Sequence, residues 1–507
     1  MNHWVIAPVV LPAVLAPIIV LWMRHDIILQ RVFSVIGTLA LLAIAIFLCI
    51  LASDGHVEVY KLGNWEAPFG IVLVLDQLAA LMVLITALLA VAVVLYAIGS
   101  GWDAKGWHFH SLLQFQLMGI CGAFLTGDAF NLFVFFEVLL IASYGLMIHG
   151  GGQHRLRAGV QYVVYNLAGS CLFLFALGTI YSVTGTLNMA DLAVKIAQIP
   201  AGETGLLRVG VVLLLMVFAI KAALVPFQFW LPGTYVNAPG PVAALFAVMT
   251  KVGIYAILRM GTLAVGPEST LGTLLTDLLQ PAALITLVIG MVGVLGAKDM
   301  GRTVAFSVIG SVGTMMLAFG QFTEAATGAG LYYMVHSTFA AAALFLIVDL
   351  VRARRGATGL ALVPAAPIVN HGLLAAMFFA GAIAMAGMPP LSGFVGKLLI
   401  MDALRPSPEV WIYWAAILVT SLIAIMGFGL SGSMVFWKAY AVEGTADHEA
   451  LEPAPAQALA ITSVMGLLGV LVVLTLGAGP ISAWLRETAA QIHAPGAYIA
   501  AVLGVAG

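Results

Sequence analysis

Charged residues are scarce in this chain. Aspartate, glutamate, lysine and arginine make up 8% of its 507 residues, and hydrophobic residues make up 63%. Because soluble domains carry about 25% charged residues, this composition excludes a soluble globular protein and indicates a polytopic membrane protein. Long basic runs are lacking too: the densest cluster is Arg352, Arg354 and Arg355, and the formal net charge is −2. A nucleic-acid partner is therefore excluded.

Cysteine is also rare. The chain has three, Cys49, Cys121 and Cys171, each alone in an apolar segment and without CxxC spacing. This pattern excludes a disulfide framework and a cysteine metal site. We expect all three to be small buried hydrophobic residues.

Two further features are lacking. No basic segment and no small-residue cleavage site precede the first apolar run, so we expect that run to remain as a spanning helix. No stretch has the composition of a soluble domain either. The longest polar stretch, residues 439–457, contains four acidic residues and two prolines and is predicted to be a solvated loop.

Apolar segments long enough to cross a bilayer recur along the whole chain. Taking about 20 apolar residues for one span, we predict an all-α fold with about fourteen transmembrane helices, at residues 4–23, 32–52, 70–99, 112–128, 129–148, 159–185, 206–231, 241–265, 273–296, 301–321, 329–351, 368–404, 410–437 and 458–485. Only Thr126, Gly127 and Asp128 separate the fourth from the fifth, and one long re-entrant segment is the alternative there.

Lysine and arginine are distributed unevenly between the two sets of alternate loops. One set holds eleven of them, namely Arg24, Arg31, Lys105, Arg155, Arg157, Lys298, Arg302, Arg352, Arg354, Arg355 and Lys438. The other holds six, namely Lys61, Lys195, Arg208, Arg259, Arg405 and Arg486. The positive-inside rule places the first set in the cytoplasm. We therefore predict a multi-pass membrane protein with both termini outside.

Four charged residues are predicted to be buried well inside spans: Glu137, Lys221, Lys251 and Lys397. Each unpaired charge at the centre of a spanning helix costs about 2.5–3.5 kcal/mol, so four would cost on the order of 10–14 kcal/mol. Such residues usually face a bundle interior and mark ion or proton pathways. We predict a proton relay formed by these four residues and His336, because histidine changes charge near neutral pH.

The relay needs lysines that switch between two states. Burial disfavours the charged form of a lysine, and a carboxylate within about 4–6 Å favours it. Glu137 is the natural partner of Lys221. Movement of that carboxylate, or of a cation, would then switch the lysine between its loaded and unloaded forms.

Each of these residues also has a purely structural interpretation. Glu137 and Lys221 could be a static link between helices, and Lys397 could extend its amine to the membrane surface because its helix ends soon afterwards. His336 could simply hydrogen-bond a neighbour.

For two aspartates the sequence predicts a position in the fold but no function. Asp76 is predicted to lie at the membrane interface, early in the third span. Asp349 is predicted at a cytoplasmic helix end, near Arg352.

Prolines interrupt two of the spans. Pro226 follows Lys221 in the seventh, and Pro389 and Pro390 precede Lys397 in the twelfth. A proline removes a helical hydrogen bond and frees a carbonyl that water could solvate. Two interrupted segments in corresponding positions are a pointer to inverted repeats in transporters. We therefore predict four parts: 1–111 with helices one to three, a first five-helix repeat at 112–265, a second at 266–437, and 438–507 with a loop, helix fourteen and a tail.

Three stretches carry a family resemblance. GDAFNLFVFFEVLLIASYGL, KAALVPFQFWLPGTYVNAPGPVAALFAVMTKVGIYAILR and AGMPPLSGFVGKLLIMDAL resemble the antiporter-like subunits shared by respiratory complex I and the multisubunit Mrp-type antiporters. The wording is most similar to the D-type subunit of the Mrp-type (Pha, Mnh) monovalent cation/proton antiporters.

The resemblance implies a function. In such a protein Glu137 on the fifth helix pairs with Lys221 on the broken seventh, Lys251 relays, and His336 and Lys397 continue the path along the membrane midplane. It also implies assembly with other hydrophobic subunits and exchange of Na⁺ or K⁺ for protons, by a transporter that is not an enzyme and has no cofactor. A proton-pumping subunit of a complex I-like or hydrogenase-type quinone oxidoreductase is the alternative, and a non-conducting assembly scaffold is a third.

The chain departs from some relatives at two positions. Ser311 stands where some have a histidine in the tenth helix, and Ala340 stands where some have a lysine after His336. We therefore expect the second half of the relay to have fewer ionisable groups, with water bridging between them.

Overall fold

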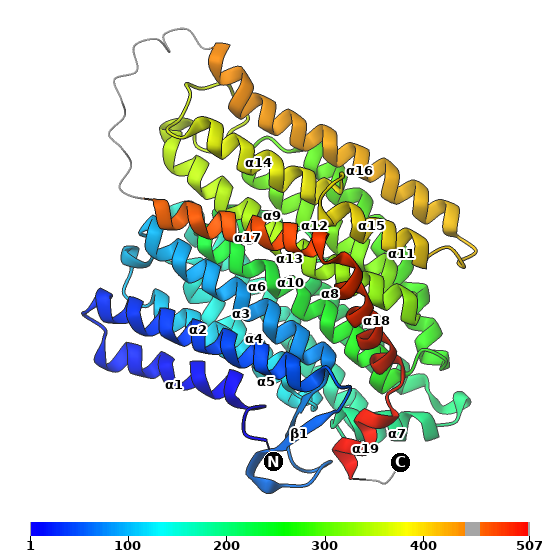
Figure 1. Cartoon of the computed structure of the whole chain (residues 1–507). Helices are drawn as coiled ribbons and strands as arrows, with labels where there is room; N and C mark the ends of the chain where they lie inside the picture. Colours follow the sequence, from blue (N-terminus) through cyan, green and yellow to red (C-terminus); the bar gives the residue numbers. More distant parts are fainter. Residues whose placement is uncertain (1, 442–456, 505–507) are drawn as a thin grey trace.

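Helices make up nearly all of the computed structural model, which describes residues 2–441 and 457–504. The long helices run side by side in one bundle (Figure 1). Up to residue 259 they are α1 (Ala7–Trp22), α2 (Ile27–Ala52), α3 (Gln77–Ser100), α4 (Phe109–Leu125), α5 (Ala129–Met147), α6 (Gln153–Thr184), α7 (Met189–Gln198), α8 (Gly205–Ala222), α9 (Trp230–Asn237) and α10 (Gly240–Arg259). The later ones are α11 (Thr270–Gly296), α12 (Met300–Phe319), α13 (Glu324–Arg354), α14 (His371–Ala386), α15 (Ser392–Ala403), α16 (Val410–Gly432), α17 (Ala458–Leu476), α18 (Ala478–His493) and α19 (Gly496–Leu503).

The predicted membrane fold is confirmed. Among the described residues, eleven helices are long and apolar enough to cross a membrane. Three shorter apolar helices, α1, α4 and α14, coincide with the remaining predicted spans. The figure of about fourteen spans stays a prediction, because it depends on how the shorter helices sit in the bilayer. Most of the predicted loop at 439–457 lies outside the described residues.

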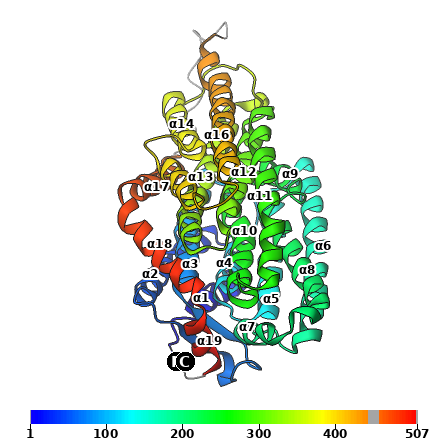
Figure 2. The same cartoon turned by 90° about the vertical axis from the view of Figure 1, so that its right-hand side faces the viewer.

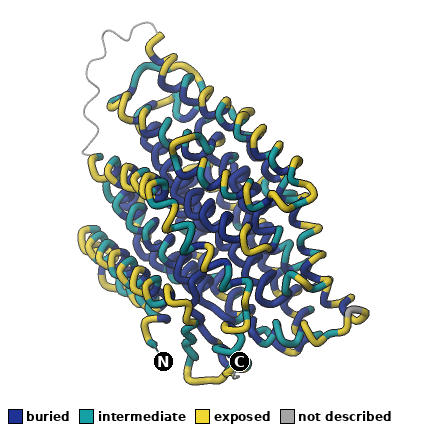
Figure 3. The backbone as a smooth tube through the Cα atoms, turned by 45° about the vertical axis from the view of Figure 1, so that its right-hand side comes forward, coloured by how far each residue is buried: buried dark blue, intermediate teal, exposed yellow. Residues whose placement is uncertain are grey.

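Three helices form the centre of the bundle. The apolar spans of α10 and α13 are buried along their whole length, and nearly all of α12 is buried. Figure 2 shows these three between α6 and α8 on one side and α17 and α18 on the other, and Figure 3 shows the buried backbone concentrated there. A helix that is apolar on all sides belongs in such a core. Lys251 on α10 and His336 on α13 are therefore central.

Both predicted helix breaks are present. α8 ends at Ala222, Ala223 adopts a left-handed conformation with φ 57°, and α9 begins at Trp230. α14 ends at Ala386 and α15 begins at Ser392. The peptide bonds before Pro226 and Pro390 are cis. Since proline has no N–H to continue a helical ladder, the interruptions fall where the prolines stand.

The fourth and fifth spans are separate helices. α4 ends at Leu125, and α5 starts after Asp128, whose carboxylate accepts a hydrogen bond from the backbone N–H of Asn131 at 2.8 Å. An aspartate at this position satisfies one of the free N–H groups of the first turn. The two helices then pack against each other as a hairpin.

Several predicted boundaries are wrong. The segment expected to start the third span at residue 70 instead contributes β2 (Val72–Leu75), which pairs antiparallel with β1 (Glu58–Lys61). A run of valine and leucine residues favours a strand where it can pair with another, and Asp76 then begins α3 as its N-cap. The predicted last span, 458–485, is divided at Gly477 into α17 and α18. The short helix α7 was not predicted.

The expected burial of the three cysteines is correct for one of them. Cys121 on α4 is buried, Cys49 on α2 is half-buried and Cys171 on α6 is exposed on the surface of the bundle. An apolar segment in a membrane protein can turn such a residue toward lipid as readily as toward the core. Hydrophobicity alone therefore did not fix the inward face of α6.

The loops gather at two ends. The first and last described residues lie at the same end, beside β1 and α19 (Figures 1 and 2), as an even number of spans requires. At the opposite end Arg155 donates to Asn237 O at 3.0 Å and Arg352 donates to Val236 O at 2.6 Å. Which end faces the cytoplasm stays a prediction.

A buried carboxylate links α2 to α4 at the end of the bundle opposite the termini. Asp103 is fully buried and accepts hydrogen bonds from Arg31 Nε at 2.6 Å and from His110 Nε2 at 3.2 Å. Burial alone would raise the pKa of Asp103, but the hydrogen bonds and charges of these two partners outweigh it, and the pKa is lowered. Arg31, which was predicted to lie in a loop, is thus on α2 and part of an internal link.

Labelling will test the predicted orientation. Arg302 and Arg405 have side chains 57% and 71% exposed, and they belong to the two opposite predicted sets. In a background with the three native cysteines replaced by alanine, we expect Arg405→Cys to react with a membrane-impermeant maleimide added to intact cells. We expect Arg302→Cys to react only after permeabilisation. The reverse pattern would invert the assigned topology.

Candidate functional site

The five predicted relay residues all lie on helices that cross the bundle. Glu137 is on α5, Lys221 in the last turn of α8, Lys251 on α10, His336 on α13 and Lys397 on α15. Lys251 and His336 are fully buried, Lys221 and Lys397 are 6% and 5% exposed, and Glu137 is half-buried. Because the bilayer supplies no hydrogen bonds, the protein must satisfy these groups itself.

Glu137 and Lys221 lie close enough to interact electrostatically, as predicted, but the hydrogen bonds of each go to α6. Ser170 donates a hydrogen bond to the Glu137 carboxylate, and Lys221 Nζ donates to Asn166 Oδ1 at 2.9 Å. Asn166 and Ser170 are one turn apart on α6, which packs against both α5 and α8, so their side chains lie on one face. α6 therefore lies between Glu137 and Lys221 and connects them.

The backbone at the α8 break is satisfied by side chains. Trp230 Nε1 donates to Ile220 O at 3.0 Å, and the N–H of Val225 donates to Thr286 Oγ1 at 2.9 Å. The Ile220 carbonyl, beside Lys221, therefore binds the indole of α9. These contacts hold the break in one shape and fix the position of Lys221.

Lys251 is the least satisfied of the buried charges. Its Nζ has no hydrogen-bond partner within the part of the chain that the structure describes. It lies where α10 crosses α8, at Gly253, whose missing side chain lets the helix approach Lys221 Cβ and the backbone of Ala222 and Phe218. A Cβ on Gly253 would lie 2.7 Å from the Ala222 nitrogen, so glycine allows the two lysine helices to meet.

His336 and Lys397 contact the two helix ends that flank the second break. His336 Nδ1 is 2.9 Å from Ser392 Oγ at the start of α15. Lys397 Nζ donates to Ala386 O, the last residue of α14, and to Ser421 Oγ, both at 2.8 Å. A cation at a helix C-terminus is stabilised by the free carbonyls there. The alternative in which Lys397 reaches the membrane surface is therefore wrong.

Hydroxyl groups occupy the region where the sequence lacks ionisable groups. Ser311 of α12 and Ser337 of α13 are hydrogen-bonded to each other, and both are fully buried. The Tyr333 hydroxyl lies beside Ser311, and its ring is 5.5 Å from that of His336. This is the part of the predicted relay that has fewer ionisable groups. A buried hydroxyl pair can hold a water between ionisable neighbours.

Two aspartates have partners that the sequence did not predict. Asp76, at the start of α3, is only 2% exposed and makes a bidentate ion pair with Arg259, at 2.6 and 2.8 Å. Asp349 lies near the end of α13, as expected, and accepts hydrogen bonds from Tyr96 at 2.8 Å and Trp102 Nε1 at 2.7 Å. Both sets of contacts join residues more than 180 positions apart, so no local pattern could reveal them.

Charged side chains beside breaks in membrane helices are the arrangement that secondary transporters use for substrates and coupling ions. The fold and the buried charges together are therefore typical of a multi-pass membrane transporter.

Comparison with known proteins assigns the family. The chain matches the family described as NADH:quinone oxidoreductase/Mrp antiporter, TM, over residues 126–424. It is 38% identical to the D-type subunit of a probable K(+)/H(+) antiporter of Rhizobium meliloti, over 98% of this chain and 96% of the relative. It is also 38% identical to the D-type subunit of the Na(+)/H(+) antiporter of Alkalihalophilus pseudofirmus, over 99% and 100%. The chain therefore belongs to the NADH:quinone oxidoreductase/Mrp antiporter family, and the predicted resemblance is confirmed.

Solved structures share the fold. A chain of the Mrp complex from Dietzia sp. DQ12-45-1b aligns with a TM-score of 0.89 at 28% identity, over 99% of this chain and all of that chain. A chain of respiratory complex I from Thermus thermophilus aligns with a TM-score of 0.79 at 24% identity and shows the fold alone.

The contact through α6 predicts the effect of one substitution. A hydrogen bond to a charged group is worth about 1.5–3 kcal/mol, so Asn166→Leu should slow cation-dependent proton movement by about ten- to a hundredfold. The measurement is fluorescence of a pH-sensitive dye in vesicles. Leu167→Ala, on the exposed side of the same helix, is the matched control and should keep the original rate. Equal rates for Asn166→Leu and the original protein would show that the α6 contact is dispensable.

Proposed function

We propose that this chain is the proton-translocating subunit of a multisubunit monovalent cation/proton antiporter. The observation that supports this most directly is the row of ionisable residues on five helices through the buried middle of one bundle, with two of the lysines beside helix breaks. Relatives named as the D-type subunits of such antiporters, over nearly the whole chain, support the same function.

The proton path starts at Glu137 and runs inward through α6. Ser170 and Asn166 connect the carboxylate to Lys221, and the close crossing at Gly253 brings Lys221 next to the helix of Lys251. Burial favours the neutral form of each lysine and a neighbouring negative charge favours the protonated form. A proton therefore moves along the row when the charge at either end of it changes.

The second half continues the path with fewer charges. His336 follows Lys251, and Lys397 ends the row at the α14 break. The hydroxyls of Ser311 and Ser337 lie in this part. The two predicted repeats, 112–265 and 266–437, each contain five predicted spans with the break in the fourth, which supports an internal duplication.

We assign the cation and the partner subunits from the names of the relatives. One relative is named for K⁺ and another for Na⁺, so we assign the class of monovalent cations. The partners are other hydrophobic subunits of one complex, as in the Mrp complex that shares this fold. The complex is placed in the bacterial inner membrane, with both termini of this chain outside.

A redox-driven proton pump is the second candidate. A chain of the membrane-bound sulfane sulfur reductase, an archaeal respiratory membrane complex, aligns with a TM-score of 0.87 at 26% identity. Purification of the complex distinguishes the two, because a redox complex must copurify with subunits that carry flavin or iron–sulfur absorbance.

The first functional test substitutes the two residues at the start of the proposed proton path. Glu137→Ala and Lys221→Ala should each lower Na⁺- or K⁺-dependent dissipation of a proton gradient at least tenfold, because each leaves a buried partner without its proton donor or acceptor. The assay uses vesicles that contain the whole complex, with complex abundance measured by immunoblot. Normal exchange by an assembled Glu137→Ala or Lys221→Ala complex would refute the relay.

The second test addresses Lys251 alone. Lys251→Ala should also abolish exchange, whereas Lys438→Ala, which changes an exposed lysine just after α16, should leave it unchanged. The rate of exchange at saturating cation is the readout. An active Lys251→Ala complex would assign Lys251 a packing role only.

A further inference from the structure

A buried ion pair lies outside the proposed proton path, at the end of α10 nearest the termini. Arg259 is 4% exposed and Asp76 is 2% exposed. The Arg259 Nη1 and Nη2 atoms donate to the two Asp76 carboxylate oxygens at 2.6 and 2.8 Å. Burying two charges is costly even when they are paired, so the location of this pair calls for an explanation.

The pair lies on the same helix face as Lys251. Lys251, Tyr255 and Arg259 follow each other at four-residue intervals on α10, and such residues are neighbours on one face. Helical side chains lean toward the N-terminus of their helix, so Tyr255 covers the turn that contains Lys251. Arg259 in turn leans over Tyr255, with its Nε 3.3 Å from the Tyr255 hydroxyl. This face leads directly from Lys251 to the nearer end of the bundle.

The guanidinium has a fixed orientation along this face. Its Nε points toward Tyr255 and the interior, and its two terminal nitrogens point toward Asp76 at the start of α3. The Tyr255 hydroxyl itself donates to Phe124 O at 2.7 Å. A proton that moved outward from Lys251 would therefore meet the positive side of the pair first.

The outer side of the pair is covered. The Tyr498 ring of α19 lies 5.3 Å from the guanidinium of Arg259, and Asp128 at the start of α5 lies close enough to Tyr498 to interact electrostatically. Gln491 of α18 accepts a hydrogen bond from the N–H of Gln77 at 2.9 Å, next to Asp76. The C-terminal helices thus separate Arg259 from solvent.

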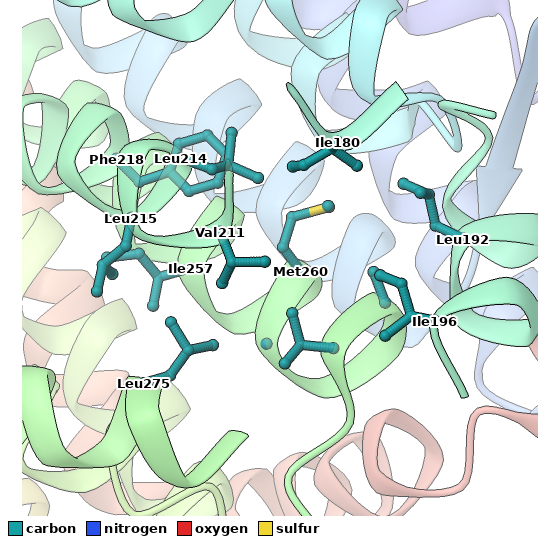
Figure 4. Close-up of a pocket in the computed structure, with 13 residues that line it drawn as sticks. Ile180, Leu192, Ile196, Val211, Leu214, Leu215, Phe218, Ile257, Met260 and Leu275 are labelled. Carbon is teal, nitrogen blue, oxygen red and sulfur yellow. The ribbon is translucent and has the colours of Figure 1, made fainter. Parts of the chain in front are cut away.

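The other face of the same turn offers no polar route. A cavity of about 20 Å³ lies there, lined by apolar side chains of α6, α7, α8, α10 and α11 and of the π-helical turn Met260–Val265 that follows α10. Figure 4 shows Ile257, Met260 and Leu275 among its lining residues. A cavity without polar partners stays dry. At this end of α10 the Arg259 face is consequently the polar one.

We propose that Arg259 is an electrostatic seal between Lys251 and the end of the bundle that carries the termini. Its permanent positive charge, positioned by Asp76 and covered by Tyr498, stops the proton on Lys251 from escaping along α10. Arginine charges serve the same purpose where membrane pores exclude protons and cations. This inference rests on the proposed function, because a seal needs a proton carrier behind it.

The size of the effect follows from the helix geometry. Eight residues along a helix separate the two positions by about 12 Å. At an effective dielectric constant of about 20, one unit charge at that distance changes an equilibrium by about tenfold. Removal of the charge should raise proton leak by a similar factor.

The test measures passive proton leak without any transported cation. Vesicles containing the whole complex receive a pH step in choline buffer, and an entrapped dye reports the decay. Arg259→Gln should leak about ten times faster than the original complex, and Arg259→Lys should leak at the original rate. Arg405→Gln, which removes an exposed pair with Asp402, is the matched control and should change nothing.

A double variant separates a seal from a structural link. Arg259→Gln combined with Lys251→Ala should lose the extra leak, because the carrier behind the seal is gone. Leak that persists in the assembled double variant, or an assembled Arg259→Gln complex without extra leak, would overturn the proposal. If Arg259→Gln does not assemble, Tyr498→Ala decides: exposing the guanidinium to water should raise leak several-fold, again only while Lys251 is present, and an unchanged leak overturns the seal.

The two proposals fail in different ways. Unchanged cation exchange in Lys251→Ala would refute the proton relay. Unchanged choline-buffer leak in Arg259→Gln, with normal loss of exchange in Lys251→Ala, would refute the seal alone.

Discussion

Every charge buried in this chain must find its partner inside the protein, because the hydrocarbon core of a bilayer provides no water to solvate it. The rest of the architecture depends on that constraint. Lys397 satisfies it with the free carbonyl at the end of α14 and the hydroxyl of Ser421. Lys221 satisfies it with the amide of Asn166. These partners are neutral, so neither lysine is held permanently in its charged form by a contact carboxylate.

The exception is Arg259, whose partner is a carboxylate. A bidentate pair of arginine and aspartate is strong and geometrically specific, and arginine keeps its proton. Neutral hydrogen-bond partners beside Lys221 and Lys397 and a charged partner beside Arg259 thus distinguish two lysines of the proposed proton path from an arginine outside it. The same bundle uses both kinds of residue on a single helix, α10, which carries Lys251 in its middle and Arg259 at its end.

The two halves of the bundle share a framework and differ in chemistry. Each has a span broken at a proline, with a lysine close to the break. In the first half α6 supplies Asn166 and Ser170 to connect Glu137 with Lys221. In the second half α12 supplies Ser311, and the two predicted relay residues there, His336 and Lys397, are not carboxylates. The first half therefore holds the charged end of the row, and the second half holds its polar continuation.

The sequence by itself determined the membrane fold, the position of most long helices, both helix breaks and the burial of Lys221, Lys251, His336 and Lys397. These follow from local properties: length and hydrophobicity of a segment, proline chemistry, and the energy of a charge in an apolar stretch. The helix end at Gly477 and the strand at Val72–Leu75 were missed because neighbouring elements decide them. Only the tertiary structure decided which residues contact each other. Asn166 and Ser170 enter between Glu137 and Lys221, and Asp76 finds Arg259 far away in the chain, because partners across a bundle are set by how the helices pack and not by any spacing along the sequence.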